Sequence, residues 1–89
     1  MSHRFEGDFS RLIRHRREDL NLTQAEVAEQ IGVTPDCVTL FELGYRRPDL
    51  DRIPALADVL KLNRRQLYRQ ALRERAPELY RQLFRGRIA

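Results

Sequence analysis

The chain has 89 residues and a net charge of +4, with 17 Lys and Arg against 13 Asp and Glu. This length has room for one small domain with one modest hydrophobic core. The single cysteine, Cys37, excludes an intrachain disulfide and is typical of the reducing cytoplasm. No apolar run has the length of a membrane span or the character of a signal peptide, so we expect a cytoplasmic protein that does not bind membranes.

The charge is unevenly distributed along the chain. Residues 1–45 hold five Arg and eight acidic residues, whereas residues 46–89 hold twelve Lys and Arg and five acidic residues. Sixteen of the 17 cations are Arg, whose planar guanidinium suits bidentate binding of phosphate or carboxylate. The same bias also fits an ordinary solvated surface, because charge patterning on its own is a weak signal.

Apolar residues recur at helical spacing along the whole chain, which predicts an all-α fold. A first helix is expected over residues 8–19, with Asp8 as its N-cap. Asn21 follows it and tolerates the left-handed conformation that ends helices. Residues 1–7 precede the first apolar stripe, and we expect them to be disordered.

Two short helices joined by a tight turn come next. Thr23 and Glu26 form a capping box at the start of the second helix, since each side chain can bond the backbone amide of the other residue. Thr34 caps the third helix, and Pro35 loses no hydrogen bond at its first position. A turn this short forces the two helices to cross steeply, which predicts a helix-turn-helix motif over residues 23–43.

The remaining chain predicts three more helices. Asp51 is a suitable cap for the fourth, which would place Pro54 at the third position, where its missing amide proton costs nothing. Asn63 caps the fifth helix, and Pro77 opens a sixth. Residues 8–75 would then form the domain.

Residues 76–89 are expected to add a short C-terminal helix and a tail. The apolar residues of this segment fall on one side of the helix, and they are Leu79, Tyr80, Leu83 and Phe84. This stripe could serve as a dimer contact if it is exposed. The alternative is that the sixth helix folds onto its own domain.

The segment LTQAEVAEQIGVTPDCVTLFELGYRRPDLDRIPALADVLKL, residues 22–62, resembles the Cro/repressor-type (XRE) helix-turn-helix family. The similarity lies in the combination of Leu-Thr-Gln, Ala28, Gly-Val-Thr, Phe-Glu and a closing glycine. It implies a five-helix lambda-repressor-like DNA-binding domain whose third helix is the recognition helix. Asn21 and Lys61 stand where the family usually has Gly, so we expect the helix before Lys61 to end differently.

The resemblance implies that the outer side of the third helix contacts base edges. At about 100° per residue, Val38 and Phe41 mark the inner side. The expected base-contact residues on the outer side are Thr34, Pro35, Asp36, Thr39, Leu40 and Leu43. None of them is a cation, which leaves two interpretations open.

In the first interpretation, Asp36 accepts a hydrogen bond from cytosine and the apolar residues contact thymine methyl groups. In the second, Leu40 and Leu43 form an apolar surface for a protein partner. If the helix reads DNA, the binding energy has to come mainly from phosphate contacts nearby. The expected phosphate-contact residues flank the motif and are Thr23, Gln24, Tyr45, Arg46 and Arg47.

The resemblance also places Arg17 opposite Glu42, which implies a partly buried ion pair that fixes the third helix. The alternative is two independent surface charges. His3, His15 and Cys37 stand at unrelated spacings, so we expect no metal site, no cofactor and no catalytic group.

Together these features predict a double-stranded DNA-binding transcriptional regulator that acts as a homodimer on a pseudo-palindromic operator. The alternative is that the helix-turn-helix fold serves as a protein-interaction module, such as an adaptor or anti-repressor. We expect the regulator to act by occupancy, as a small repressor or autoregulator, with an antitoxin of the same DNA-binding role as the alternative subtype.

Overall fold

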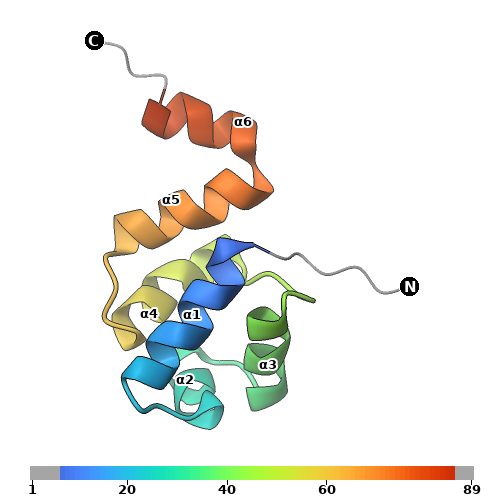
Figure 1. The fold of residues 1–89 in the computed structure, drawn as a ribbon, viewed down its shortest axis with the longest axis vertical. Helices are drawn as coiled ribbons and strands as arrows, with labels where there is room; N and C mark the ends of the chain where they lie inside the picture. The colour runs from blue at the N-terminus through green and yellow to red at the C-terminus, as the bar shows by residue number, and fades with distance from the viewer. Residues whose placement is uncertain (1–6, 86–89) are drawn as a thin grey trace.

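The structure, a computed structural model, describes residues 7–85, and over this range it contains helices and no strands (Figure 1). The α-helices are α1 (Asp8–Asp19), α2 (Gln24–Ile31), α3 (Pro35–Leu43), α4 (Ile53–Val59), α5 (Arg64–Arg75) and α6 (Pro77–Tyr80). A 3-10 turn at Leu50–Arg52 precedes α4, and a π-helical turn at Arg81–Arg85 continues α6. The predicted all-α class with an additional C-terminal helix is confirmed. Of the predicted disordered segment, residues 1–6 lie outside the described residues.

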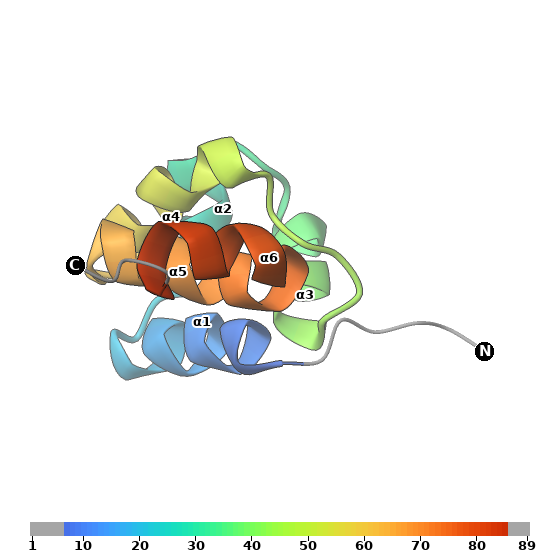
Figure 2. The ribbon, with the colours of Figure 1, turned by 90° about the horizontal axis from the view of Figure 1, so that it is seen from above.

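Helices α1 to α4 form a compact group, and α5 crosses one end of it (Figure 1). Helix α6 lies on the outer side of α5, as the view from above also shows (Figure 2). Helix α3 packs against α1 and α2 and occupies one side of the group. The C-terminal helix therefore lies at the end of the molecule away from α2.

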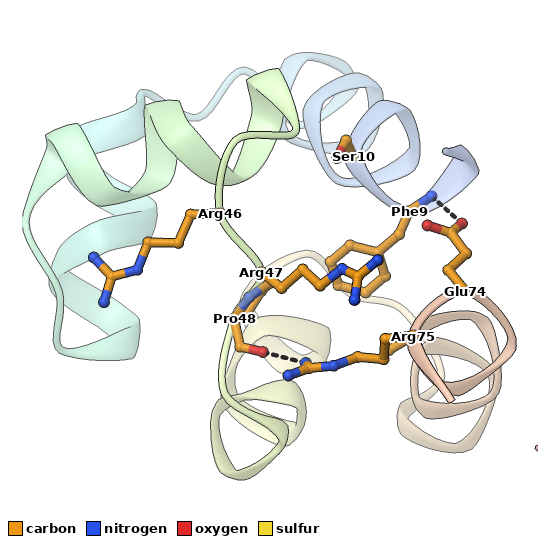
Figure 3. Close-up of a pocket in the computed structure, with 8 residues that line it drawn as sticks. Phe9, Ser10, Arg46, Arg47, Pro48, Glu74 and Arg75 are labelled. Carbon is orange, nitrogen blue, oxygen red and sulfur yellow. Dashed lines mark hydrogen bonds between the residues drawn. The ribbon is translucent and has the colours of Figure 1, made fainter. Parts of the chain in front are cut away.

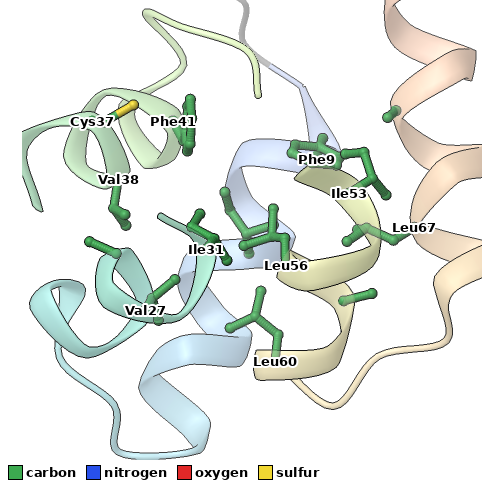
Figure 4. Close-up of a cluster of buried hydrophobic side chains, with 14 residues drawn as sticks. Phe9, Val27, Ile31, Cys37, Val38, Phe41, Ile53, Leu56, Leu60 and Leu67 are labelled. Carbon is green, nitrogen blue, oxygen red and sulfur yellow. The ribbon is translucent and has the colours of Figure 1, made fainter. Parts of the chain in front are cut away.

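The hydrophobic core lies between α2, α4 and α5, and α1 and α3 close its sides (Figure 4). Its largest fully buried side chains are Ile53, Leu56, Leu60, Leu67, Val27 and Val38. Each of these side chains contributes about 1.5–3 kcal/mol by leaving water. Cys37 is buried at the edge of this core, which fits a small packing residue.

Side chains cap three helices as the sequence predicts. The Thr23 hydroxyl accepts the Glu26 amide at 3.0 Å, and the Glu26 carboxylate accepts the Thr23 amide at 2.7 Å. Thr34 caps α3, and Asn63 caps α5 by accepting the amide of the third helical residue. These caps satisfy amide groups that have no partner within the helix, so they fix where α2, α3 and α5 begin.

The predicted cap of the first helix is wrong. Asp8 is the first helical residue, Gly7 holds the N-cap position, and the Asp8 carboxylate binds Arg11 at 2.7 Å. The amide of Phe9 instead donates to the Glu74 carboxylate of α5 at 2.8 Å. A side chain 65 residues away therefore does the work of a local cap.

The predicted cap of the fourth helix is also wrong. Asp51 lies inside the 3-10 turn, which is closed by a 2.9 Å backbone bond to the Asp49 carbonyl. The α-helix consequently begins later, at Ile53, and Pro54 falls in its first turn. The missing amide proton of proline is harmless there too, because first-turn amides have no partner inside the helix.

Two residues other than glycine adopt left-handed backbone conformations. Asn21 has φ 58° after α1, and Lys61 has φ 55° after α4. Because Lys61 stands where the family usually has Gly, the sequence predicts that this helix ends differently from the family. Lys61 nevertheless adopts a left-handed conformation, as Asn21 does. For a residue with a Cβ atom this conformation costs about 1–2 kcal/mol, which the surrounding packing has to offset.

A buried ion pair joins α1 to α3. The Arg17 Nε donates to Glu42 Oε2 at 2.7 Å, and its Nη2 donates to Oε1 at 3.0 Å. The Glu42 side chain is only 4% exposed and that of Arg17 is 14% exposed. Hydrogen bonding to Glu42 raises the pKa of the Arg17 guanidinium above its ordinary value. The remaining Arg17 Nη1 donates to the Leu22 carbonyl at 2.8 Å, so the pair also anchors the chain that leads into α2.

The same carboxylate is connected to α2. Gln24 Nε2 donates to Glu42 Oε1 at 3.0 Å, and Gln24 Oε1 accepts the hydroxyl proton of Thr39 at 2.7 Å. Arg17, Glu42, Gln24 and Thr39 thus form one continuous hydrogen-bonded chain across α1, α2 and α3. We call these four residues the buried network.

Replacing either member of the ion pair with alanine leaves its partner buried without its counter-charge. We expect Glu42→Ala and Arg17→Ala each to lower the free energy of unfolding by about 2–4 kcal/mol. The double variant should lose less than the sum, with a coupling energy of about 1–3 kcal/mol. Urea unfolding followed by circular dichroism measures all three values. Strictly additive losses would show that the two charges act independently.

Candidate nucleic-acid interface

The outer face of α3 is open to solvent along its length. Val38, Phe41 and Glu42 turn inward and are buried. Of the six expected base-contact residues, Thr34, Pro35, Asp36, Leu40 and Leu43 are exposed. Leu40 and Leu43 are 37% and 40% exposed. The face is therefore narrow, mostly apolar and acidic at its N-terminal end.

Thr39, the sixth expected base-contact residue, is half-buried. Its hydroxyl proton is directed to Gln24 Oε1, and its oxygen also lies 3.2 Å from the Pro35 carbonyl. The methyl group and the remaining oxygen lone pairs are what Thr39 can offer to a base edge. Thr39 is therefore the half-buried member of the buried network that borders the outer face of α3.

Gln24, an expected phosphate-contact residue, is part of that network. Its carbonyl oxygen accepts from Thr39, and one of its two amide protons goes to Glu42. At most one amide proton is left to reach a phosphate. Helical spacing and family resemblance place Gln24 correctly at the start of α2, but they do not predict that its side chain bonds Glu42 and Thr39.

The loop after α3 carries the cations that α3 lacks. Gly44 ends the helix at φ 84°, and the amides of Tyr45 and Arg46 both donate to the Leu40 carbonyl, at 3.0 and 3.3 Å. Tyr45 and Arg46 are exposed and Arg47 is half-buried. The two arginine side chains leave the loop in opposite directions (Figure 3). The expected phosphate-contact residues of this loop therefore lie directly beside the C-terminal end of the expected reading face.

Three long-range contacts hold this loop and its surroundings. Arg75 Nη1 of α5 donates to the Pro48 carbonyl at 2.5 Å, and Arg52 Nη1 donates to the Ile31 carbonyl at 2.6 Å. Glu74, beside Arg75, binds the start of α1. Sequence reasoning misses all three residues, because their partners lie 21 to 65 residues away and no local pattern marks them.

The expected dimer-contact residues divide into two pairs. Tyr80 and Phe84 are half-buried against α5, where Arg73 lies 5.2 Å from the Tyr80 ring centre and Arg65 lies 4.9 Å from that of Phe84. Leu79 and Leu83 are 43% and 51% exposed. The C-terminal helix therefore packs on its own domain with one side and presents two leucines with another.

Within residues 7–85, no three His, Cys, Asp or Glu side chains are grouped so that they could hold a metal ion. None of the helices in this range is both long and apolar enough to cross a lipid bilayer. His15 is exposed on α1.

Known proteins resemble this chain over the same region. The model of the helix-turn-helix family matches residues 13–67. An uncharacterised HTH-type transcriptional regulator of Bacillus subtilis, YqaE, is 31% identical over 55 residues, which are 62% of this chain and 47% of that protein. An uncharacterised HTH-type transcriptional regulator of Methanothermobacter thermautotrophicus is 46% identical over 39 residues, 44% of this chain and 56% of that protein. The chain thus spans about half the length of the curated relatives it matches.

The matched residues run from α1 into α5 and include both helices of the motif. They cover more than half of the chain, and the steep α2–α3 pair lies at their centre. The chain belongs to the XRE-type helix-turn-helix family.

Proposed function

We propose that this protein is a sequence-specific double-stranded DNA-binding transcriptional regulator that acts in the cytoplasm, on the nucleoid. The observation that carries the proposal is the solvent-exposed face of α3, rigidly held by the buried network and bordered by Arg46 and Arg47. Two relatives that bear the name of HTH-type transcriptional regulators support it. We propose that it acts by occupancy of its site, as a small repressor or autoregulator.

In this proposal α3 enters the major groove and the flanking loop grips the sugar-phosphate backbone. Asp36 would accept a hydrogen bond from cytosine N4, while Pro35 and Leu40 would contact thymine methyl groups. A face without Arg, Lys, Asn or Gln lacks the bidentate contacts that each discriminate bases by about 1–3 kcal/mol. Affinity would therefore come largely from Tyr45, Arg46, Arg47 and the amide groups at the start of α2.

We further propose that the protein binds DNA as a homodimer. The exposed Leu79 and Leu83 offer an apolar contact at the end of the molecule, next to the half-buried Tyr80 and Phe84. A two-fold dimer would place two copies of α3 in successive major grooves, about 34 Å apart, and would require a pseudo-palindromic operator.

A second function is favoured by one observation, the exposure of Leu40 and Leu43 on a helix without cations. In that case the fold would be reused as a protein-interaction module, and the same face would bind an apolar surface of a partner. The two functions differ in their dependence on salt and in what Leu40 contacts.

The salt dependence of binding to random-sequence duplex tests the role of the loop. We expect Arg46→Ala/Arg47→Ala to weaken binding to all sequences alike and to reduce the slope of log affinity against log salt by about 1 for each arginine. Fluorescence anisotropy across a salt series measures this. The control is Arg64→Ala, at the start of α5, which lies on the far side of the molecule from α3 (Figure 1). A wild-type protein with no affinity for duplex DNA would exclude the DNA-binding function.

Selection of bound sequences from a random duplex pool tests the reading face. Leu40→Ala removes an apolar contact, so it should change the preferred sequence while leaving affinity for random duplex within about twofold. Leu12→Ala is the control, because Leu12 of α1 is also 37% exposed. If Leu40→Ala leaves the selected sequence unchanged but abolishes binding to a protein partner, the interaction module is the correct function.

The oligomeric state tests the dimer surface. Leu79→Ser/Leu83→Ser should raise the dimer dissociation constant by at least about tenfold, since each substitution removes apolar area from the contact. Sedimentation velocity over a concentration series measures it, with Leu50→Ser in the 3-10 turn as an equally apolar control. A monomeric wild-type protein, or a dimer that survives the double substitution, would contradict this surface.

A further inference from the structure

The last turn of α5 is hydrogen-bonded to the loop that carries Arg46 and Arg47. Arg75 donates from Nη1 to the Pro48 carbonyl at 2.5 Å, across 27 residues of sequence (Figure 3). The neighbouring Glu74 accepts the amide of Phe9 at 2.8 Å and the side-chain amide of Gln70 at 2.7 Å. Arg75 therefore extends from a helix end that is itself tied to the start of α1.

Hydrogen bonds hold the loop after α3 at both of its ends, and the bond from Arg75 is the one at the C-terminal end. At the first end, the amides of Tyr45 and Arg46 are fixed to the Leu40 carbonyl. At the other end, Pro48 has no amide proton, so its carbonyl is the one backbone group through which a hydrogen bond can hold it. Arg46 thus belongs to the first anchor, and Arg47 lies between the two.

Two arginines of the loop and Arg75 itself border the same small pocket. Arg46, Arg47 and Arg75 line this pocket together with Glu74 and Phe9. The Arg46 side chain points away from the other two (Figure 3), so the repulsion to be overcome is that between the Arg47 and Arg75 guanidinium groups. A direct hydrogen bond from Arg75 to the backbone of the loop keeps the loop close despite this repulsion.

We infer that Arg75 is a positioning residue for DNA binding: its bond to the Pro48 carbonyl holds Arg46 and Arg47 where they meet phosphate groups. The inference rests on the proposed function. Its physical basis is preorganisation, because a loop that is already ordered loses less conformational entropy when its side chains engage the duplex. Arg75 acts through the loop and does not itself contact DNA.

The chain offers a matched control. Arg64 lies at the other end of the same helix, has the same charge, and donates two hydrogen bonds to Asp58 of α4 at 2.9 and 2.5 Å. We expect Arg75→Ala to weaken binding to random-sequence duplex about fivefold to tenfold, and Arg64→Ala to weaken it less than about twofold. Arg75→Lys should recover most of the loss, since one ammonium proton suffices for one carbonyl.

The decisive measurement repeats Arg75→Ala in the Arg46→Ala/Arg47→Ala background. If Arg75 acts through the loop, the added substitution changes affinity by less than about twofold. A full additional loss would mean that Arg75 contacts phosphate directly, and the inference would be overturned. Arg75→Ala indistinguishable from Arg64→Ala would overturn it as well, while a loss from Arg46→Ala/Arg47→Ala alone would leave the proposed function in place.

Amide hydrogen exchange gives a readout without DNA. Exchange at the amides of residues 45–47 and 49 should be faster in Arg75→Ala than in wild type and unchanged in Arg64→Ala. Arg75→Met, which keeps the aliphatic part of the side chain, replaces the alanine variant if circular dichroism shows that the latter is unfolded. Unchanged exchange in a folded Arg75 variant would contradict the anchoring role.

Discussion

A carboxylate removed from water has to be surrounded by donors, and Glu42 of α3 meets this requirement with groups from two other helices. Arg17 of α1 supplies two hydrogen bonds and Gln24 of α2 supplies a third, all to a side chain that is 4% exposed. Because each donor has to be in place at the same time, the angles between α1, α2 and α3 are coupled. The orientation of the exposed face of α3 therefore depends on Glu42, a charged residue on the opposite side of the same helix.

In the proposed function, two neighbouring parts of the chain share DNA binding. The outer face of α3 is apolar and acidic, so it would contribute shape and methyl contacts with little attraction for phosphate. The loop that follows carries adjacent arginines and is fixed at both of its ends. Because base contacts and phosphate contacts would come from separate segments, substitutions in one segment need not abolish the contribution of the other.

Local chemistry made much of the fold predictable. Each of three helices starts at the expected cap, which is Thr23, Thr34 or Asn63. The side-chain oxygen of each cap accepts the backbone amide three residues later, so the contact is local and needs no residue from a distant part of the chain. The pairing of Arg17 with Glu42 followed only from resemblance to a family. Asp8 and Asp51 were assigned as caps by the same local logic, but a distant carboxylate and a 3-10 turn took over that role. The anchoring of Pro48 by Arg75 joins two segments that no periodic pattern connects.

The attachment of α6 to α5 depends on guanidinium groups stacked on aromatic rings, with Arg65 and Arg69 over Phe84 and Arg73 over Tyr80. These contacts join a cation to the face of an aromatic ring, so they involve no carboxylate. Acidification that neutralises carboxylates elsewhere leaves these contacts intact. The C-terminal helix can therefore stay docked under conditions that loosen ion pairs on the rest of the surface.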